Sequence, residues 1–278
     1  NMPCVYLKPV RSQESCRQFV LGKSLEHIGP GGGLFTLSNT ILRDGPRQQV
    51  EFLNELQKLA IEQTRLRIPL IQIEEGTHGL MAPGGTIFPE GLGMGCCWDI
   101  DLIRNVFSAA AKEARSIGVT HLCTLVVEPI RDPRLGRNEE AFSEDPYLTS
   151  RIAEAIVEGV QGKDISANDK VVAILCHYPG QSQPTGGTER GSMEISERNL
   201  REIFLPSWEA GIRTGALGVM ATYPEHDGVP THASRKILTR ILREELRFQG
   251  FVVSEGGGLQ TLLDERVAAN AEEAGELA

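Results

Sequence analysis

Residues 248–258 of the 278-residue chain read FQGFVVSEGGG. The apolar run from Phe251 to Val253 is short, β-branched and bounded by glycine, which is typical of a buried strand that ends in a loop. Glu255 follows this run almost at once. A charged group beside an apolar core costs free energy unless it is paired or used in chemistry. The stretch therefore predicts a buried strand that ends at a carboxylate, and this carboxylate is either paired with another group or used in chemistry.

The same arrangement recurs along the chain. Four other apolar runs end in polar residues and turns, at 69–73, 122–127, 171–175 and 217–221. Segments with helical periodicity lie between or beside them, at 100–118, 146–162, 196–212 and 237–250. Alternation of strands and helices predicts a parallel sheet with crossover helices, and both a doubly wound sheet and a (β/α) barrel fit it. No G-x-G-x-x-G sequence opens a helix after the first strand, which disfavours a dinucleotide-binding fold.

The polar residues after these runs are the candidates for a functional site. In a parallel α/β fold the carboxyl ends of the strands share one face, where active sites gather. Glu75, Arg137, His177, Tyr223 and Glu255 each follow or end a different run. Carboxylates accept hydroxyl protons while arginine and histidine donate, so this set suits a polyhydroxylated ligand.

Each of these residues also has a purely structural interpretation. Glu255 alone could be a solvated loop carboxylate, and His177 a core histidine with a backbone partner. Arg137 could simply pair with nearby glutamates, and Tyr223 could pack with its hydroxyl satisfied. A metal site from His78, His177 and Glu255 has no local ligand spacing to support it. The repetition at five strand ends is what favours a shared site.

Composition narrows the class of partner. The net charge is −9 and the pI is near 5.3, which disfavours nucleic acid and anionic membranes as partners. No apolar run approaches the roughly 20 residues that span a bilayer, so no membrane span is predicted. The six cysteines show no C-x-x-C spacing. They are therefore interpreted as reduced or buried thiols rather than as a zinc site or a disulfide scaffold.

Several long segments resemble glycoside hydrolase family 3, the β-glucosidase and β-xylosidase type. The segment RDPRLGRNEEAFSEDPYL (131–148) is similar to the family's R-D-P-R-W-G-R-x-x-E-x-x-x-E-D-P-Y signature. The segments IPLIQIEEGTHG (68–79) and TIFPEGLGMGCCWD (86–99) resemble two further family stretches, and 195–212 and 226–255 continue the similarity in family order.

This resemblance implies a fold and a set of roles. The fold would be an α/β, (β/α)8 TIM-type barrel, irregular or incomplete, with parallel strands and outer helices. Residues 1–278 would form a single barrel domain, without the second α/β sandwich domain that members usually carry and that commonly supplies the general acid/base. Glu255 takes the place of the catalytic nucleophile, and the sugar-binding positions fall on Glu75, Arg137, Cys176, His177 and Tyr223. No cofactor and no metal is implied.

Three departures from the family pattern bear on activity. The nucleophile is usually Asp in V-S-D-W, whereas this chain has Glu255 followed by three glycines. The usual Lys-His pair is Cys176-His177, which replaces an ammonium group by a weak thiol donor. The loop PGQSQPTGGTERGS (179–192) lacks the histidine of the N-acetylglucosaminidase subgroup, which argues against that subgroup and leaves the acid/base unidentified.

The resemblance therefore predicts a retaining, exo-acting β-glycosidase that removes terminal non-reducing β-linked glucose or a related sugar. Two alternatives stay open, a catalytically weakened sugar-binding barrel and a glycoside phosphorylase. The expected partners are a carbohydrate substrate and either a second domain or another copy of the chain. The resemblance favours a secreted or periplasmic location, and the residues themselves leave the compartment undecided.

Overall fold

The computed structural model describes residues 4–6, 10–24 and 29–278, with residues 4–6 and 125 described by their backbone alone. The chain divides into two compact units. The first comprises Asn1–Phe88, Val106–Cys123 and Val160–Val172, and the second comprises Pro89–Asn105, Thr124–Gly159 and Ala173–Ala278.

Seven strands form a sheet whose order follows the chain, β1-β2-β3-β4-β5-β6-β9. The strands are β1 Cys4–Tyr6, β2 Gly33–Phe35, β3 Ile71–Glu75, β4 His121–Val126, β5 Val172–Tyr178, β6 Gly218–Ala221 and β9 Phe251–Ser254. The pairs β1/β2, β2/β3, β3/β4, β5/β6 and β6/β9 are parallel. A doubly wound sheet reverses its strand order at a switch point, whereas barrel strands follow the chain. The predicted TIM-type α/β class is confirmed, with seven strands in the main sheet of the described residues.

The first unit contains elements that were not predicted, since no element was expected before residue 69. Its helices are α1 Gln13–Val20, α2 Leu37–Thr40 and α3 Pro46–Gln63. Ser12 caps α1 by accepting from the Ser15 N–H, and Pro46 occupies the first position of α3. Arg17 joins α1 to α3 by donating to both carboxylate oxygens of Glu55, at 2.5 and 3.0 Å.

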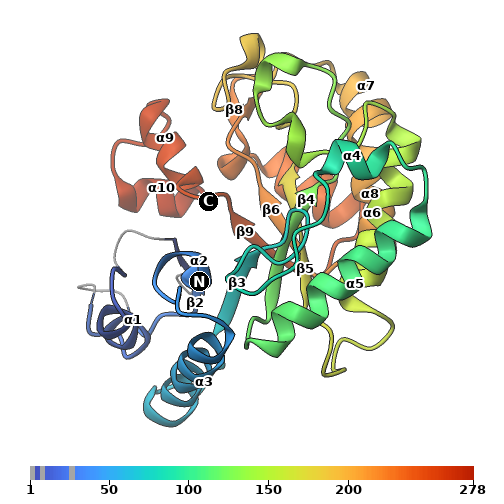
Figure 1. The fold of residues 1–278 in the computed structure, drawn as a ribbon. Helices are drawn as coiled ribbons and strands as arrows, with labels where there is room; N and C mark the ends of the chain where they lie inside the picture. Colours follow the sequence, from blue (N-terminus) through green and yellow to red (C-terminus); the bar gives the residue numbers. More distant parts are fainter. Residues whose placement is uncertain (1–3, 7–9, 25–28) are drawn as a thin grey trace. The chain divides into compact units, whose positions relative to one another are not determined.

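The second unit holds most of the predicted helices and four strand ends. Its short helical segments and full helices include α4 Gly91–Gly95, α6 Pro146–Gln161, α7 Glu197–Asn199, α8 Leu205–Arg213, α9 Thr261–Asp264 and α10 Ala271–Leu277. Helix α5, Ile100–Ser116, begins here. Figure 1 shows α6 and α8 beside the strands β5 and β6. Helix α8 packs closely on β5, because a Cβ added at Gly211 would lie 2.6 Å from Leu175 Cδ1.

Two helical segments differ from the prediction in pitch. Leu200–Phe204, between α7 and α8, and Arg235–Glu245 have π-type hydrogen bonding. Ile237, Ile241 and Leu242 are nevertheless buried, as their spacing predicted. The apolar positions therefore identify the helix and its inner face, while they do not distinguish a π pitch from an α pitch.

A hairpin follows β6 and was not predicted. Strands β7, Glu225–His226, and β8, Val229–Pro230, pair antiparallel. The turn residues Asp227 and Gly228 both have positive φ, 55° and 78°. Asp-Gly between short strands is the sequence signal for such a turn. Within the described residues, no helix has both the length and the apolar character that a membrane crossing requires.

Candidate functional site

Four of the predicted site residues lie at strand ends of the second unit. Glu255 follows β9 directly, and His177 is the penultimate residue of β5. Tyr223 follows β6 by two residues, and Arg137 lies in the loop after β4. These strands are parallel neighbours, so their carboxyl ends meet at one edge of the sheet. The structure therefore brings Arg137, His177, Tyr223 and Glu255 together.

The carboxylate of Glu255 lies at the centre of this group. Glu255 is only 4% exposed. Its Oε1 accepts hydrogen bonds from Arg137 Nη1 and from Gln181 Nε2, both at 2.9 Å. Its Oε2 accepts from the Tyr223 N–H at 3.1 Å, and His177 Nε2 lies 3.4 Å from Oε1. The charge at the end of the buried strand is thus paired, as FVVSE predicted.

Burial and charge act in opposite directions on this carboxyl group. Burial raises the pKa of Glu255 to about 8, although Arg137 and the Tyr223 N–H lower it. Burial, with a smaller contribution from the Arg137 charge, holds the pKa of His177 well below its ordinary value. His177 is therefore a neutral imidazole beside the carboxyl group, and Arg137 is the cation that contacts Glu255.

Arg137 holds three carboxylates at once. Its Nε and Nη2 donate to the two oxygens of Glu140, each at 2.7 Å. Its Nη1 donates to Glu189 at 2.5 Å and to Glu255 at 2.9 Å. Burial lowers the pKa of Arg137, but Glu140 and Glu255 outweigh burial and the pKa lies above its ordinary value. A planar guanidinium held on two sides in this way has a fixed orientation.

Tyr223 contributes its backbone and its ring. The hydroxyl donates to the Gly256 carbonyl at 2.7 Å, so the ring is tied to the turn that follows Glu255. The guanidinium of Arg190 lies 4.2 Å from the ring centroid, a cation–π distance. Burial raises the pKa of the Tyr223 phenol to about 12. Tyr223 therefore stays neutral and braces the turn of residues 255–258.

A buried network positions Gln181. Glu128, fully buried two residues after β4, accepts from Trp208 Nε1 at 2.8 Å and from the Gly180 N–H. Ser182 donates to the Pro129 carbonyl at 2.9 Å. Gln181 lies between Gly180 and Ser182, so both of its flanking residues are fixed to the segment after β4. The amide that binds Glu255 is therefore presented by a braced turn rather than by a free loop.

The other two predicted site residues belong to β3 and β5. Glu75 is the last residue of β3, half-buried in the first unit. Cys176 is buried in β5, where its Sγ lies 3.5 Å from the Ile174 carbonyl oxygen, and a cis peptide bond joins it to His177. His78 Nδ1 lies 2.7 Å from the Phe88 carbonyl oxygen. Among the described residues, no group of three or more His, Cys, Asp or Glu side chains is arranged to hold a metal ion.

Known proteins are similar to this chain in sequence and in fold. The description "Glycosyl hydrolase family 3 N terminal domain" matches residues 31–278. The chain belongs to glycosyl hydrolase family 3. The predicted resemblance is confirmed.

Family 3 relatives are longer than this chain. A β-xylosidase of Formosa agariphila is 36% identical over 224 residues, covering 76% of this chain and 31% of the relative. A periplasmic β-glucosidase of Salmonella typhimurium is 31% identical over 246 residues, covering 88% of this chain and 30% of the relative. The solved structure of a β-glucosidase from Erythrobacter marinus superposes with a TM-score of 0.84 at 34% identity. The superposition covers 89% of this chain and 33% of that protein. The chain thus spans about a third of the length of these relatives.

Several residues of this family 3 site were not predicted from the sequence. Gln181 and Glu189 lie in the loop after β5, and no local pattern in the sequence singles them out. Glu140 is expected only as a structural partner of an arginine, and it does pair with Arg137. Glu128 was visible as a carboxylate directly after a buried strand, the same signal that identified Glu255.

The buried carboxyl group of Glu128 predicts a pH-dependent stability. Burial raises the pKa of Glu128 to about 7. The native state therefore keeps a proton that the unfolded chain has lost above about pH 4.5, so stability falls as pH rises through this window. Glutamine can accept from Trp208 and Gly180 with its oxygen and donate to Ser182 Oγ with its nitrogen. We expect Glu128→Gln to unfold at the same temperature as the wild type at pH 5 and several degrees higher at pH 8.

Thermal unfolding followed by circular dichroism at the two pH values measures this difference. Glu209→Gln, an exposed change on the helix that carries Trp208, is the matched control and should follow the wild type. An equal loss of stability between pH 5 and pH 8 in Glu128→Gln and wild type would show that Glu128 does not take up the proton.

Proposed function

We propose that this chain is the barrel portion of a retaining, exo-acting β-glycosidase that releases a terminal non-reducing β-linked glucose or xylose. The observation that carries the proposal is the Glu255 carboxylate at the end of β9, held by Arg137, Gln181 and the Tyr223 N–H. Relatives named β-xylosidase and β-glucosidase support the substrate class.

In this proposal Glu255 is the nucleophile. Its carboxylate attacks the anomeric carbon, the bond to the leaving oxygen breaks, and a glycosyl ester forms on Glu255. Water then attacks the same carbon from the opposite face, and the sugar leaves with its original anomeric configuration. Arg137 favours the ionised carboxylate that the first step needs. The remaining proposed sugar-binding residues are Glu75, Cys176, His177 and Tyr223.

The leaving oxygen also needs a proton. We propose that residues 1–278 act as one barrel domain and that a general acid/base comes from a second domain or another copy of the chain. The family resemblance supports this assignment. An aryl glycoside with a dinitrophenolate leaving group needs little protonation, so it can report on Glu255 even where that acid is missing.

A second candidate is a sugar-binding barrel with weak or no turnover. Both Glu255 oxygens are already occupied by protein donors, and a pKa of about 8 favours the protonated, less nucleophilic form at neutral pH. This reading predicts saturable sugar binding without release of the aryl group.

A trapped intermediate separates these two candidates. We expect 2,4-dinitrophenyl 2-deoxy-2-fluoro-β-glucoside or the β-xyloside to add one fluorosugar to the chain, with release of one equivalent of dinitrophenolate. Peptide mass spectrometry should locate the sugar on Glu255, and Glu255→Gln should remain unlabelled. Labelling of another carboxylate would reject Glu255 as the nucleophile, and sugar binding without labelling would favour the second candidate.

A further inference from the structure

A cavity lies in the same unit as Glu255, and Glu255 is not among the residues that line it. Its volume is about 570 Å³, within the range of small-ligand pockets. Two of its walls come from segments that also serve the site, since Arg131–Arg134 precedes Arg137 and Gln183–Gly186 follows Gln181. The lining residues on which the inference depends are Arg131, Gln183, Glu194, Ile195, Asn199 and Phe204.

The walls of this cavity are held by the protein itself. Arg134 donates to both oxygens of Asp132, at 2.9 and 2.7 Å, across the base of one wall. The loop opposite is closed by a hydrogen bond from the Thr185 N–H to the Ser192 carbonyl at 2.8 Å. Gly187 joins the two walls, because a Cβ there would lie 2.4 Å from the Arg134 carbonyl oxygen. The cavity is therefore formed before any ligand arrives.

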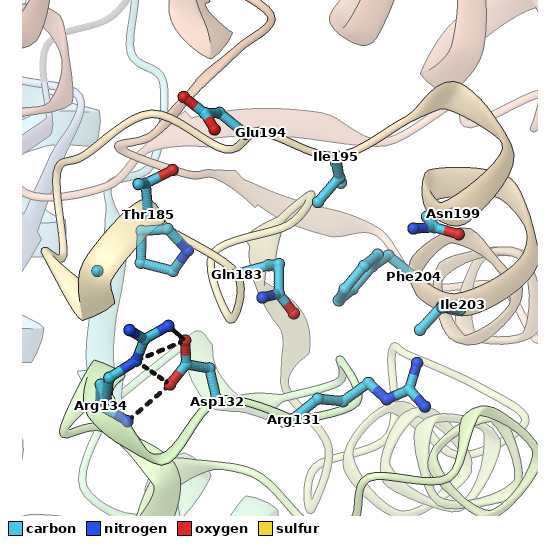
Figure 2. A pocket seen from close by; sticks show the side chains of 12 residues that line it. Arg131, Asp132, Arg134, Gln183, Thr185, Glu194, Ile195, Asn199, Ile203 and Phe204 are labelled. Atoms are coloured by element: carbon cyan, nitrogen blue, oxygen red, sulfur yellow. Dashed lines mark hydrogen bonds and ion pairs between the residues drawn. The ribbon is translucent and has the colours of Figure 1, made fainter.

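The lining of the cavity combines an apolar side with polar side chains that are free to bind a ligand. Figure 2 shows Gln183, Ile195, Phe204 and Arg131 around a common space. Phe204 is buried and Ile195 is half-buried, which provides an apolar surface. Within residues 29–278, the side chains of Arg131, Gln183, Glu194 and Asn199 have no hydrogen-bond or ion-pair partner. Donors and acceptors of both kinds thus face the cavity beside an apolar patch.

This chemistry excludes several ligand classes. A phosphate or sulfate is disfavoured, because Arg134 is committed to Asp132 and the Glu194 carboxylate would repel an anion. A divalent cation would need several oxygen ligands, and the free Arg131 opposes it. A neutral sugar ring offers hydroxyl groups that both donate and accept, together with an apolar C–H face.

We propose that this cavity is a second carbohydrate-binding site, which takes one or two sugar units of a neutral β-linked oligosaccharide. Arg131, Gln183, Glu194 and Asn199 would bind hydroxyl groups, and Phe204 with Ile195 would contact the ring face. The proposal concerns binding and does not require that the chain hydrolyse the sugar. Because the walls continue into Arg137 and Gln181, a bound sugar would also hold the segments that carry these two residues.

Amide chemical shifts during titration with cellobiose and with xylobiose test the proposal. All arms use the Glu255→Gln background, so the probe stays intact whether or not the chain is a hydrolase. We expect one of the two disaccharides to move two separate groups of signals, one around Glu255 and one around Gln183, Ile195 and Phe204. The double variant Arg131→Ala/Asn199→Ala should weaken binding at the second group by at least about tenfold while the first group responds as before.

Arg198→Ala, an exposed neighbour of Asn199 outside the cavity, is the matched control and should change neither group. Titration with inorganic phosphate should not move the amide signals of the second group. Signals that move only around Glu255 with both disaccharides, or a second group that the double variant leaves unchanged, would overturn the proposal. Movement with phosphate in place of sugar would assign the cavity to anions and would overturn it as well.

Discussion

Glutamine at position 255 is expected to lower the rate of 2,4-dinitrophenyl β-glycoside hydrolysis by at least about 10³-fold, because an amide cannot form the glycosyl ester. The glutamine oxygen can still accept from Arg137 and Gln181, and the one hydrogen bond lost is that from the Tyr223 N–H, so the fold should survive. Release of dinitrophenolate, with circular dichroism as the check on folding, measures the effect.

Two further variants separate the reactivity of Glu255 from its charge and reach. Glu255→Asp keeps the charge but withdraws the carboxylate by one methylene from Arg137 and the Tyr223 N–H, so we expect a smaller loss. Glu255→Ala leaves room for azide, which should restore aryl release and give the α-glycosyl azide, since azide attacks from the face of the missing carboxylate. Equal rates in wild type and Glu255→Gln, or azide rescue that yields the β-product, would remove Glu255 from the mechanism.

The strand ends were predictable because their signal is local. A short apolar run followed within two residues by a charged or aromatic side chain marks the edge of a buried strand, and His177, Tyr223 and Glu255 carry this signal. Parallel order then brings them to one edge of the sheet without knowledge of any loop. Arg137 lies further along the loop after the run 122–127, so it follows from the family resemblance rather than from this signal. The short strands β1 and β2 have three residues each, too few for periodicity to identify.

The loop residues Gln181, which binds Glu255, and Glu189, which binds Arg137, were not predictable in the same way. Gln181 and Glu189 reach the site through the path of one loop, and that path depends on Glu128, Trp208 and the Arg134 carbonyl. Each of these contacts joins residues tens of positions apart, so no spacing in the sequence reports them. The convergence of Glu140, Glu189 and Glu255 on one guanidinium is a property of the folded chain.

Two of the three glycines after Glu255 are required for different structural reasons. Glutamate is one methylene longer than the usual aspartate, and glycine gives the backbone freedom to accommodate the longer side chain. Gly257 does adopt a left-handed φ of 77°, which favours glycine. Gly258 is required for a different reason, because a Cβ there would lie 2.3 Å from the His232 ring. His232 in turn contacts Ser254 Oγ at 3.0 Å, so the turn packs against its own strand.

Arg137→Gln is expected to lower kcat/KM for the same aryl glycosides by about 10²- to 10³-fold at pH 7, because it removes the cation nearest the proposed nucleophile. Arg137 lowers the pKa of Glu255 against the effect of burial. Without it the pKa of Glu255 rises, and a smaller fraction of the carboxylate is ionised at neutral pH. The rise of kcat/KM with pH, expected near pH 8 in the wild type, should therefore move to higher pH.

Arg137→Lys separates the charge from the geometry. Lysine keeps a cation beside Glu255 but cannot hold the two oxygens of Glu140 while binding Glu189 and Glu255. We therefore expect the lysine variant to keep the wild-type position of the pH profile at a reduced rate, whereas the glutamine variant changes both. The measurement is kcat/KM from pH 5 to pH 10 for the three proteins, each checked for native circular dichroism. A glutamine variant that loses rate equally at every pH would show that Arg137 positions Glu255 without altering its ionisation.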